Sequence, residues 1–425
     1  MIGKRIREAR LRAGLSQSQL AHPELSDSYI SLIESGGRTP TANVLQIIAS
    51  KLDCSVEYLI HGIPAEQIQH IETNLNLARS ALENGARREA KRRFAEVLSD
   101  ANIERLPDLR RQGEYGLALA AEACGDLDEA IDILMRLRSE DVGPLPDEMR
   151  IASALALTRC YRDQGNTQAA INVAEHEISR MLEKGWTDHL IELGATLLSC
   201  HITQGDLLRA QHYSTELLSA ADKLRTPRSI VAAHWNAAIL AEMTGDYEKA
   251  LAFIERAWSV QAAEGEPRNR ARLHTEYVAL RLRVRPHEAA ACREDLLQIE
   301  DELRKTSASV LDLAYCQLLL ARAEVELGHG EQAVEYGLKA VELNGETNSE
   351  LQAEAQVLLA QAYVMLDRAE DAAAALQAAA EALAKEQPNR GTAEIWLMVA
   401  SVYQAMGDQE GSRAAYQRAM ECGGV

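Results

Sequence analysis

The residues most able to do chemistry in this chain are scattered instead of grouped. The seven cysteines include no C-x-x-C pair, the spacing that holds zinc or forms a redox couple. His176 and His189 lie in helical stretches without a cysteine or histidine partner at ligand spacing, and the acids Asp128, Glu129 and Asp132 are typical of solubilising charge. No phosphate loop, dinucleotide fingerprint, zinc-protease motif or serine-hydrolase motif occurs. We therefore predict a protein that is not an enzyme, with no catalytic residues, no metal, no cofactor and buried thiols.

The first part of the chain carries the start and stop signals of five short helices. The second helix starts after Ser16, a good N-cap, and must end early because Pro23 follows it. The third helix starts after Ser26 and stops at Gly36, and the stretches TPTANVLQIIASKL and CSVEYLIHG supply a fourth and a fifth. Short helices of which the second and third are joined by a tight turn predict a helix-turn-helix DNA-binding domain over residues 1–63.

This segment resembles the lambda-repressor-like (XRE-type) helix-turn-helix family through LSQSQLA, SYISLIESG, RTPTANVLQIIASKLDCSVEYLI and the pair Arg10 and Glu34. The resemblance implies that Arg10 binds Glu34 and locks the first helix to the third. It also implies that the third helix faces the major groove while neighbouring residues hold the DNA backbone. The implied positions are Gln17 and its backbone amides at a phosphate, Asp27, Ser28, Tyr29 and Ser31 toward the bases, and Arg38, Thr39 and Asn43 at the adjacent backbone.

The third helix departs from the family because it contains no lysine or arginine. It has Asp27 and Leu32 where relatives often carry a cation. A carboxylate can only accept hydrogen bonds, so Asp27 would favour a cytosine amino group and repel phosphate. Non-specific affinity should then be modest and come from the first-helix cations, Arg38 and backbone amides. A docking domain that no longer binds DNA remains an alternative.

The charge of the chain is divided unevenly. The formal net charge is −19, but residues 1–62 hold seven basic and six acidic side chains, so the remainder carries about −20. We expect this acidic remainder to stand away from DNA and from anionic membranes. No stretch approaches 18 uninterrupted apolar residues, and the start MIGKRIREAR lacks the apolar region of a secretory signal. The sequence thus predicts no membrane contact and a cytoplasmic location.

The rest of the chain, residues 64–425, repeats with a period of about 40 residues. A turn residue, usually glycine, is followed five residues later by a small residue. The pairs are Gly85/Ala90, Gly125/Ala130, Gly165/Ala170, Gly205/Ala210, Gly245/Ala250, Arg285/Ala290, Gly328/Ala333, Asp367/Ala372 and Gly407/Ser412. Each unit reads as a helix, a turn and a second helix, with a mostly small residue seven positions before the turn and a larger one, such as Leu77, eight before it. We predict an all-α chain in which about nine helical hairpins form a right-handed α-solenoid.

This array resembles the tetratricopeptide repeat (TPR) family, and Trp396, Tyr403 and Gly407 match its consensus positions most closely. The resemblance implies that the first helix of each hairpin lines a groove that binds a ligand. An asparagine there can both donate to and accept from a peptide backbone, and an arginine can hold a carboxylate. The inward positions implied are Asn76, Tyr115, Arg159, Arg162, Trp235, Asn236, Arg322 and Gln361, together with Glu192 and Glu242. Each of these residues could instead make a solvated contact or a contact within the array.

Two functions remain open at this point. In the first, a homodimer binds a palindromic operator in double-stranded DNA, while the solenoid binds a peptide or protein ligand and sets the geometry of the DNA-binding domains. This architecture resembles the peptide-pheromone-responsive helix-turn-helix/TPR regulators of Gram-positive bacteria, which implies a role in quorum sensing and a short peptide as ligand. In the second, the chain is a TPR protein–protein adaptor whose DNA-binding domain is weak or non-functional.

Overall fold

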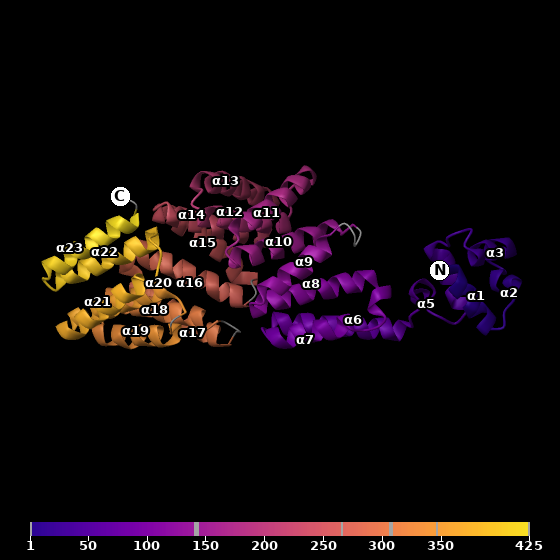
Figure 1. Cartoon of the computed structure of the whole chain (residues 1–425), viewed down its shortest axis with the longest axis horizontal. Helices are drawn as coiled ribbons and strands as arrows, with labels where there is room; N and C mark the ends of the chain where they lie inside the picture. Colours follow the sequence, from indigo (N-terminus) through magenta and orange to yellow (C-terminus); the bar gives the residue numbers. More distant parts are fainter. Residues whose placement is uncertain (1, 140–143, 265–266, 306–308, 346, 424–425) are drawn as a thin grey trace. The chain divides into compact units, whose positions relative to one another are not determined.

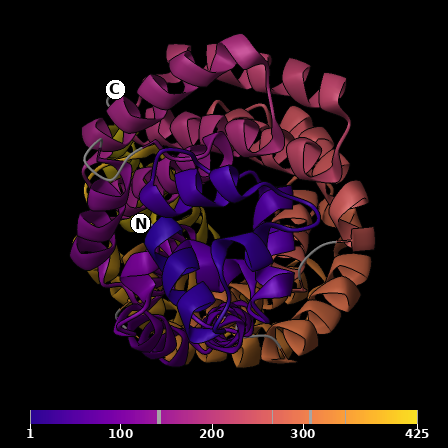
Figure 2. The ribbon, with the colours of Figure 1, turned by 90° about the vertical axis from the view of Figure 1, so that its right-hand side faces the viewer.

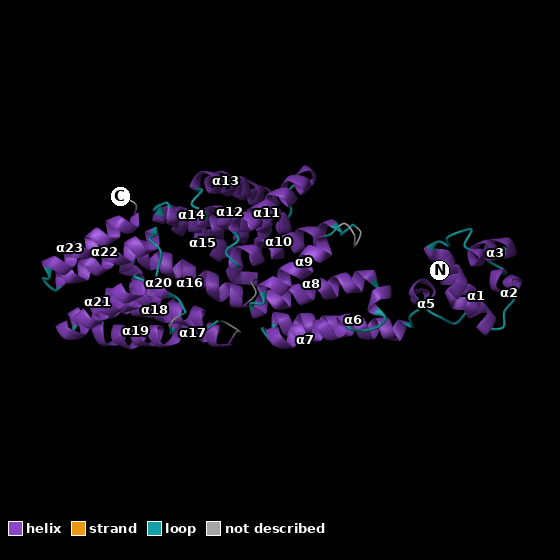
Figure 3. Cartoon of the chain, viewed as in Figure 1, coloured by secondary structure: helices purple, strands orange, loops and turns teal. Residues whose placement is uncertain are grey.

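The chain folds entirely into helices joined by short loops (Figure 3). The computed structural model describes residues 2–139, 144–264, 267–305, 309–345 and 347–423. Within these ranges it contains 23 α-helices and no strand, which confirms the predicted all-α class. The chain divides into two compact units, residues 1–170 and 171–425, and each is described by itself.

Five short helices begin unit 1, and Ser16 and Ser26 cap the second and third of them as predicted. The helices are α1 (Ile2–Arg12), α2 (Gln17–Ala21), α3 (Asp27–Ser35), α4 (Ala42–Lys51) and α5 (Val56–His61). The side chains of Ser16, Ser26, Thr41 and Ser55 each accept the backbone N–H of the residue three positions on. Each cap satisfies an N–H group that has no partner inside its helix. Figure 2 shows these helices in indigo, gathered around one another.

The core of the five-helix domain is small and aliphatic. Its fully buried large side chains are Ile6, Leu20, Ile30, Ile33, Ile48 and Leu59. Helix α1 lies very close to α3, since a Cβ atom added at Gly3 would stand 2.0 Å from the carbonyl oxygen of Ile33. Only glycine permits this approach.

The link to the first hairpin is tied down by several contacts. Gly62 ends α5 in the left-handed conformation, and the next residue, Ile63, is fully buried in the apolar core of that hairpin. The Nδ1 atom of His61 lies 3.0 Å from the carbonyl oxygen of Arg105. Arg5 on α1 holds α5 in place, because its Nε donates to the carbonyl of Leu59 at 3.0 Å. The five-helix domain and the first hairpin therefore share packed contacts.

Nine helical hairpins follow the five-helix domain within the described residues (Figure 1). Unit 1 contains α6 (Ala65–Glu83), α7 (Arg87–Leu98), α8 (Pro107–Cys124), α9 (Leu127–Arg138) and α10 (Asp147–Asp163), and α11 (Thr167–Met181) crosses the boundary between the units. Unit 2 contains α12 (Asp188–Thr203), α13 (Leu207–Leu224), α14 (Pro227–Met243), α15 (Tyr247–Glu264), α16 (Pro267–Val284), α17 (Ala289–Lys305), α18 (Val310–Glu326), α19 (Gly330–Asn344), α20 (Ser349–Met365), α21 (Ala369–Leu383), α22 (Arg390–Ala405) and α23 (Gln409–Gly423). The predicted count of hairpins is confirmed.

Residues at the repeat positions have the turn conformations and the burial that their types predict. Eight of the nine turn residues have a left-handed φ between 55° and 85°, and seven of these are glycine. The residues seven positions before the turns, from Ala78 to Ala400, are all buried. Leu77, eight positions before the first turn, is 49% exposed. It belongs to the first hairpin, which has no hairpin before it to cover that face.

One repeat position departs from the others. Ala290 is exposed, and its neighbour Ala289 is buried in the hairpin core in its place. The turn at Arg285 has an ordinary φ of −128° and continues into a short 3₁₀ helix, Pro286–Glu288. This longer turn shifts the packing position by one residue.

Two further properties of the described residues bear on the sequence predictions. Cys160, Cys200, Cys292 and Cys316 are buried, and the other three cysteines are half-buried. Burial raises the pKa of the Cys160 thiol to about 12. None of the described helices combines the length and the apolar character needed to cross a membrane.

Candidate functional site

Helix α3 presents a polar stripe on its exposed side. Ser28, Ser31, Leu32 and Ser35 are exposed and recur at helical spacing, while Ile30 and Ile33 point into the core. Asp27 is exposed at the first turn, where the Nε2 atom of His22 lies 3.3 Å from its carboxylate. The structure thus places Asp27, Ser28 and Ser31 on one accessible surface. Leu32, which is 47% exposed, belongs to the same surface and was not among the predicted contacts.

Tyr29 and Arg38 interact with each other at the edge of this stripe. The guanidinium carbon of Arg38 stands 5.1 Å from the centre of the half-buried Tyr29 ring, within the range of a cation–π contact. Thr39 and Asn43 are exposed in the following loop and at the start of α4. The loop is held to α3 because the backbone N–H of Arg38 donates to the carbonyl of Leu32 at 3.2 Å. The predicted backbone contacts therefore flank the predicted base contacts.

A buried ion pair fixes α3 against α1. Arg10 donates from Nε to Oε1 of Glu34 at 2.6 Å and from Nη2 to Oε2 at 3.0 Å, and both residues are buried. Gln17 donates from Nε2 to the same carboxylate at 2.9 Å. Burial alone would raise the pKa of Glu34, but the hydrogen bonds from Arg10 and Gln17 outweigh it, so the pKa lies below its ordinary value. The side chain of Gln17 therefore also anchors α2 to α3.

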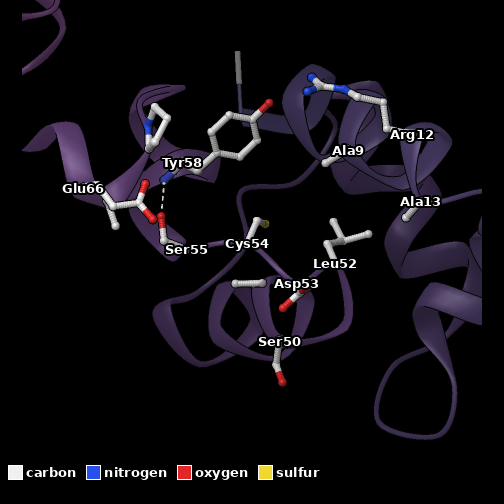
Figure 4. A pocket seen from close by; sticks show the side chains of 13 residues that line it. Ala9, Arg12, Ala13, Ser50, Leu52, Asp53, Cys54, Ser55, Tyr58 and Glu66 are labelled. Carbon is white, nitrogen blue, oxygen red and sulfur yellow. Dashed lines mark hydrogen bonds between the residues drawn. The ribbon is translucent and has the colours of Figure 1, made fainter.

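An open pocket of about 680 Å³ lies on another part of the same domain (Figure 4). It is bordered by the end of α1, the loop between α4 and α5, and the start of α6, and its lining includes Arg12, Asp53 and Tyr58. None of the residues predicted to contact DNA lines it. This pocket is therefore separate from the candidate DNA surface.

In unit 1, the predicted inward arginines already hold carboxylates. Arg159 on α10 binds Glu122 on α8 through two hydrogen bonds of 2.7 and 2.9 Å. Arg162 contacts the neighbouring Asp163, and the hydroxyl of Tyr115 lies 3.5 Å from the carbonyl oxygen of Ala152. Asn76, on α6, is exposed.

In unit 2, ion pairs likewise connect neighbouring first helices. Arg228 on α14 binds Glu192 on α12, Arg283 on α16 lies 3.2 Å from Glu242 on α14, and Arg322 on α18 binds Glu354 on α20. Gln361 is half-buried on α20. The predicted inward residues thus lie on the first helices, and four charged ones among them, Arg159, Glu192, Glu242 and Arg322, pair with residues of neighbouring first helices that were not predicted.

Helix α14 carries accessible apolar side chains near these ion pairs. Trp235 and Asn236 are half-buried, and the amide nitrogen of Asn236 donates to the carbonyl of Ala232 at 3.0 Å. Ile239 and Met243, one and two turns further on, are 39% and 37% exposed. We call Trp235, Asn236, Ile239 and Met243 the α14 stripe. Sequence reasoning missed Ile239 and Met243, although their spacing of four and eight residues from Trp235 would have indicated them.

Carboxylates gather next to the α14 stripe. Burial raises the pKa of Glu276, on α16, to about 7, and the nearby carboxylates of Glu242 and Asp312 add to the rise while Arg272 opposes it. Burial is also the main cause of the raised pKa of Glu242, against the effect of Arg283. A ligand that brings further negative charge close to Glu276 would therefore meet repulsion unless cations compensate it.

The ninth hairpin returns to contact the fifth. Tyr247, which begins α15, donates its hydroxyl to Oε1 of Glu394 on α22 at 2.9 Å, and Arg283 lies 3.5 Å from Oε2 of the same carboxylate. Arg390 donates from Nη1 to the carbonyl of Met243 at 2.5 Å. We call this group the α22 contact. No sequence signal indicates it, since Tyr247 and Glu394 are 147 residues apart.

The described residues offer no site for a metal ion. No group of three or more histidine, cysteine, aspartate or glutamate side chains lies close enough together within that part of the chain.

Comparisons with known proteins agree with this architecture. Residues 6–59 match a family model described as helix-turn-helix. Residues 75–141, 201–267 and 318–388 match one tetratricopeptide-repeat model, and residues 393–421 match another. A search of curated protein sequences finds no match.

Several solved structures share the fold at low sequence identity. The apo form of RapI is 14% identical, with a TM-score of 0.56 over 83% of this chain and 97% of that one. A Rap protein complexed with Competence and Sporulation Factor is 12% identical, with a TM-score of 0.55 and the same coverage. NprR in complex with its cognate peptide NprX is 16% identical, with a TM-score of 0.50 over 72% of this chain and 87% of that one.

Proposed function

Because this chain joins an XRE-type helix-turn-helix domain to an array of tetratricopeptide repeats, we propose that it is a DNA-binding transcriptional regulator controlled by a ligand of its repeats. The observation that carries the proposal is the stripe on α3, whose exposed polar side chains stand on a helix locked in place by Arg10 and Glu34. We place the DNA-binding domain at residues 1–63 and the sensor and dimerisation domain at 64–425.

The regulator acts as a homodimer on a palindromic operator. One helix-turn-helix domain buries too little surface for specific binding, and two half-sites about 34–36 Å apart are the geometry that such dimers read. Helix α3 carries no cation, so the backbone contacts of Arg38, Thr39, Asn43 and the α2 amides must supply the affinity. A ligand that changes the placement of the two DNA-binding domains would then move them out of register with the two half-sites of the operator.

The ligand we propose is a short peptide. Among the structures that share this fold, NprR holds its cognate peptide NprX, and a Rap protein holds Competence and Sporulation Factor. In this chain the α14 stripe offers the Asn236 amide beside the half-buried Trp235 and the exposed Ile239 and Met243, which suits the backbone and the apolar side chains of a peptide. Tyr115, Arg159, Arg162 and Asn76 in unit 1, and Arg322 and Gln361 in unit 2, remain proposed ligand contacts.

Two substitutions test the DNA surface on an operator selected from random duplexes by the purified protein. Arg38→Ala should weaken binding to all sequences and reduce the slope of log affinity against log salt by about 1, because it removes one phosphate contact. Asp27→Ala should instead relax the preference for cytosine at one position of each half-site, by about 1 kcal/mol. The measurement is a salt titration by fluorescence anisotropy, and Arg418→Ala, an exposed cation on α23, is the control.

The adaptor alternative makes a different prediction for the same experiment. Its support is the absence of any cation on α3. If the wild-type protein selects no duplex and leaves no footprint at low salt, the chain is an adaptor and the DNA-binding proposal is wrong.

The α14 stripe is tested with a mixture of random hexapeptides. Peptides that stay bound through gel filtration are identified by mass spectrometry, and the consensus peptide is synthesised and titrated. Asn236→Ala should weaken its binding about tenfold or more, since one lost backbone contact with its unpaired partner costs about 1–3 kcal/mol. DNA affinity without peptide should stay unchanged. Gln377→Ala on α21, an exposed amide, is the control, and equal peptide affinity in both variants would remove Asn236 from the site.

A further inference from the structure

Three donors from three helices converge on one carboxylate at the α22 contact. Arg283 on α16 lies 3.5 Å from Glu394, Arg390 on α22 donates to it at 3.0 Å, and Tyr247 on α15 donates its hydroxyl at 2.9 Å. Two guanidinium groups and a phenol around one carboxylate make a binding site for an anion of that shape. In the structure, the protein's own Glu394 occupies the site.

This site lies at the end of the α14 stripe. Arg390 donates to the carbonyl of Met243, the last residue of the stripe, and a Cβ atom at the nearby Gly245 would stand 2.9 Å from Nη2 of Arg390. Glu242, next to Met243, is the second acid that Arg283 contacts. An apolar surface thus leads along α14 directly to a pair of cations.

The Glu394 carboxylate is replaceable. The side chains of Arg283, Arg390 and Glu394 are each about one-third to one-half exposed, and partly exposed ion pairs are weak. Releasing Glu394 to solvent removes the carboxylate that Arg390 pairs with, while Arg283 keeps Glu242 and Glu354 nearby, so one further negative charge restores the balance. Helix α22 would keep its packing in the ninth hairpin, whose apolar core does not depend on this contact.

We propose that Arg283, Arg390 and Tyr247 bind the C-terminal carboxylate of a peptide whose apolar side chains lie on the α14 stripe, and that Glu394 holds this place in the free protein. The proposal rests on the proposed peptide-binding function and names its anchor. Binding displaces Glu394, and the peptide carboxylate then replaces it as the bridge between α22 and helices α15 and α16.

The test uses three hexapeptide libraries with random residues at the first four positions. One ends in Leu-Leu with a free carboxylate, one ends in Leu-Leu with a C-terminal amide, and one ends in Glu-Leu with a C-terminal amide. We expect the wild-type protein to retain the free-acid library at least tenfold better than either amidated library. Arg390→Gln and Arg283→Gln should each reduce this preference to less than threefold. Arg368→Gln, a variant of another partly exposed arginine that binds an acid in unit 2, should leave it unchanged.

Glu394→Gln provides an independent test, because this variant is expected to strengthen peptide binding instead of weakening it. Removing the competing charge should strengthen retention of the free-acid library about fivefold and leave the leucine amide library unchanged. It should also speed hydrogen exchange at the start of α22 and in the turn between α14 and α15 without peptide, while Glu335→Gln on α19 does not. Unchanged melting of the variants, followed by tryptophan fluorescence, shows that they fold.

The possible outcomes distinguish a failure of the carboxylate anchor from a failure of the proposed peptide-binding function. Equal retention of the free-acid library and the leucine amide library would overturn the carboxylate anchor while peptide binding stands. Equal retention of the free-acid and glutamate libraries would overturn the assignment to the chain end. Retention of none of the three would overturn both the anchor and the proposed peptide ligand.

Discussion

Replacing Glu34 by alanine should destabilise the DNA-binding domain by about 3–5 kcal/mol, the largest single effect that we expect in this chain. The substitution leaves the buried guanidinium of Arg10 without its carboxylate, with only the carbonyl of Leu15 still accepting a hydrogen bond from it. Gln17 loses its acceptor at the same time. Because α3 would no longer be held against α1, operator binding should fall with stability. All four tryptophans lie at residue 186 or beyond, so hydrogen exchange of the α1 and α3 amides is the suitable measurement.

The double variant Arg10→Met/Glu34→Leu decides whether the unpaired charge is the cause. Apolar replacement of a whole buried ion pair is often neutral or stabilising, so we expect it to recover most of the lost protection. Arg12→Ala, which removes a pair at 4.0 Å between exposed side chains, is the control and should cost less than about 1 kcal/mol. If Glu34→Ala behaves like this control, Arg10 and Glu34 do not hold α1 and α3 together.

Replacing Ile63 by alanine should have the second-largest effect, because this side chain anchors the link between the DNA-binding domain and the first hairpin. Ile63 is fully buried among Ile71, Phe94 and Ile103. Truncating a buried isoleucine costs about 2–5 kcal/mol through lost burial and the cavity left behind. We expect faster hydrogen exchange from α5 to α7 and faster proteolytic cleavage next to Gly62. If the proposed function holds, we expect operator binding by the free protein to survive this substitution better than its response to peptide.

Leu11→Ala is the matched control for this substitution. Leu11 is a large aliphatic side chain in the same domain but 59% exposed, so its loss should cost less than about 0.5 kcal/mol. Protection of residues 60–110 that is the same in Ile63→Ala as in the wild-type protein would show that Ile63 does not couple the domain to the first hairpin.

Local features of this protein could be predicted because neighbouring residues encode them. The N-caps Ser16, Ser26, Thr41 and Ser55 each bond to an N–H group three residues away, so both partners stand in one short window of sequence. The hairpin turns could be predicted in the same way, since a residue with a left-handed φ is most often glycine. The pair Arg10 and Glu34 followed from the family resemblance and is confirmed at 2.6 Å.

The partners of the charged side chains on the first helices could not be predicted in this way. Arg159 was expected to face a ligand but binds Glu122, and Arg322 binds Glu354. Which acid meets which arginine depends on how far each hairpin is rotated and shifted against the next. That rotation is the sum of many small packing differences in the apolar cores, so no single residue determines it.

The sequence by itself thus determined the class of the fold, the nine hairpins and the helix caps, because periodicity and capping act over a few residues, and the family resemblance supplied the ion pair behind α3. Only the tertiary structure decided that Ile239 and Met243 stay exposed, that Ala289 replaces Ala290 in the core, and that α22 closes onto α14 and α15. The last contact joins residues 147 positions apart. Its formation depends on the cumulative rotation of the hairpins between them, which has no local signature in the chain.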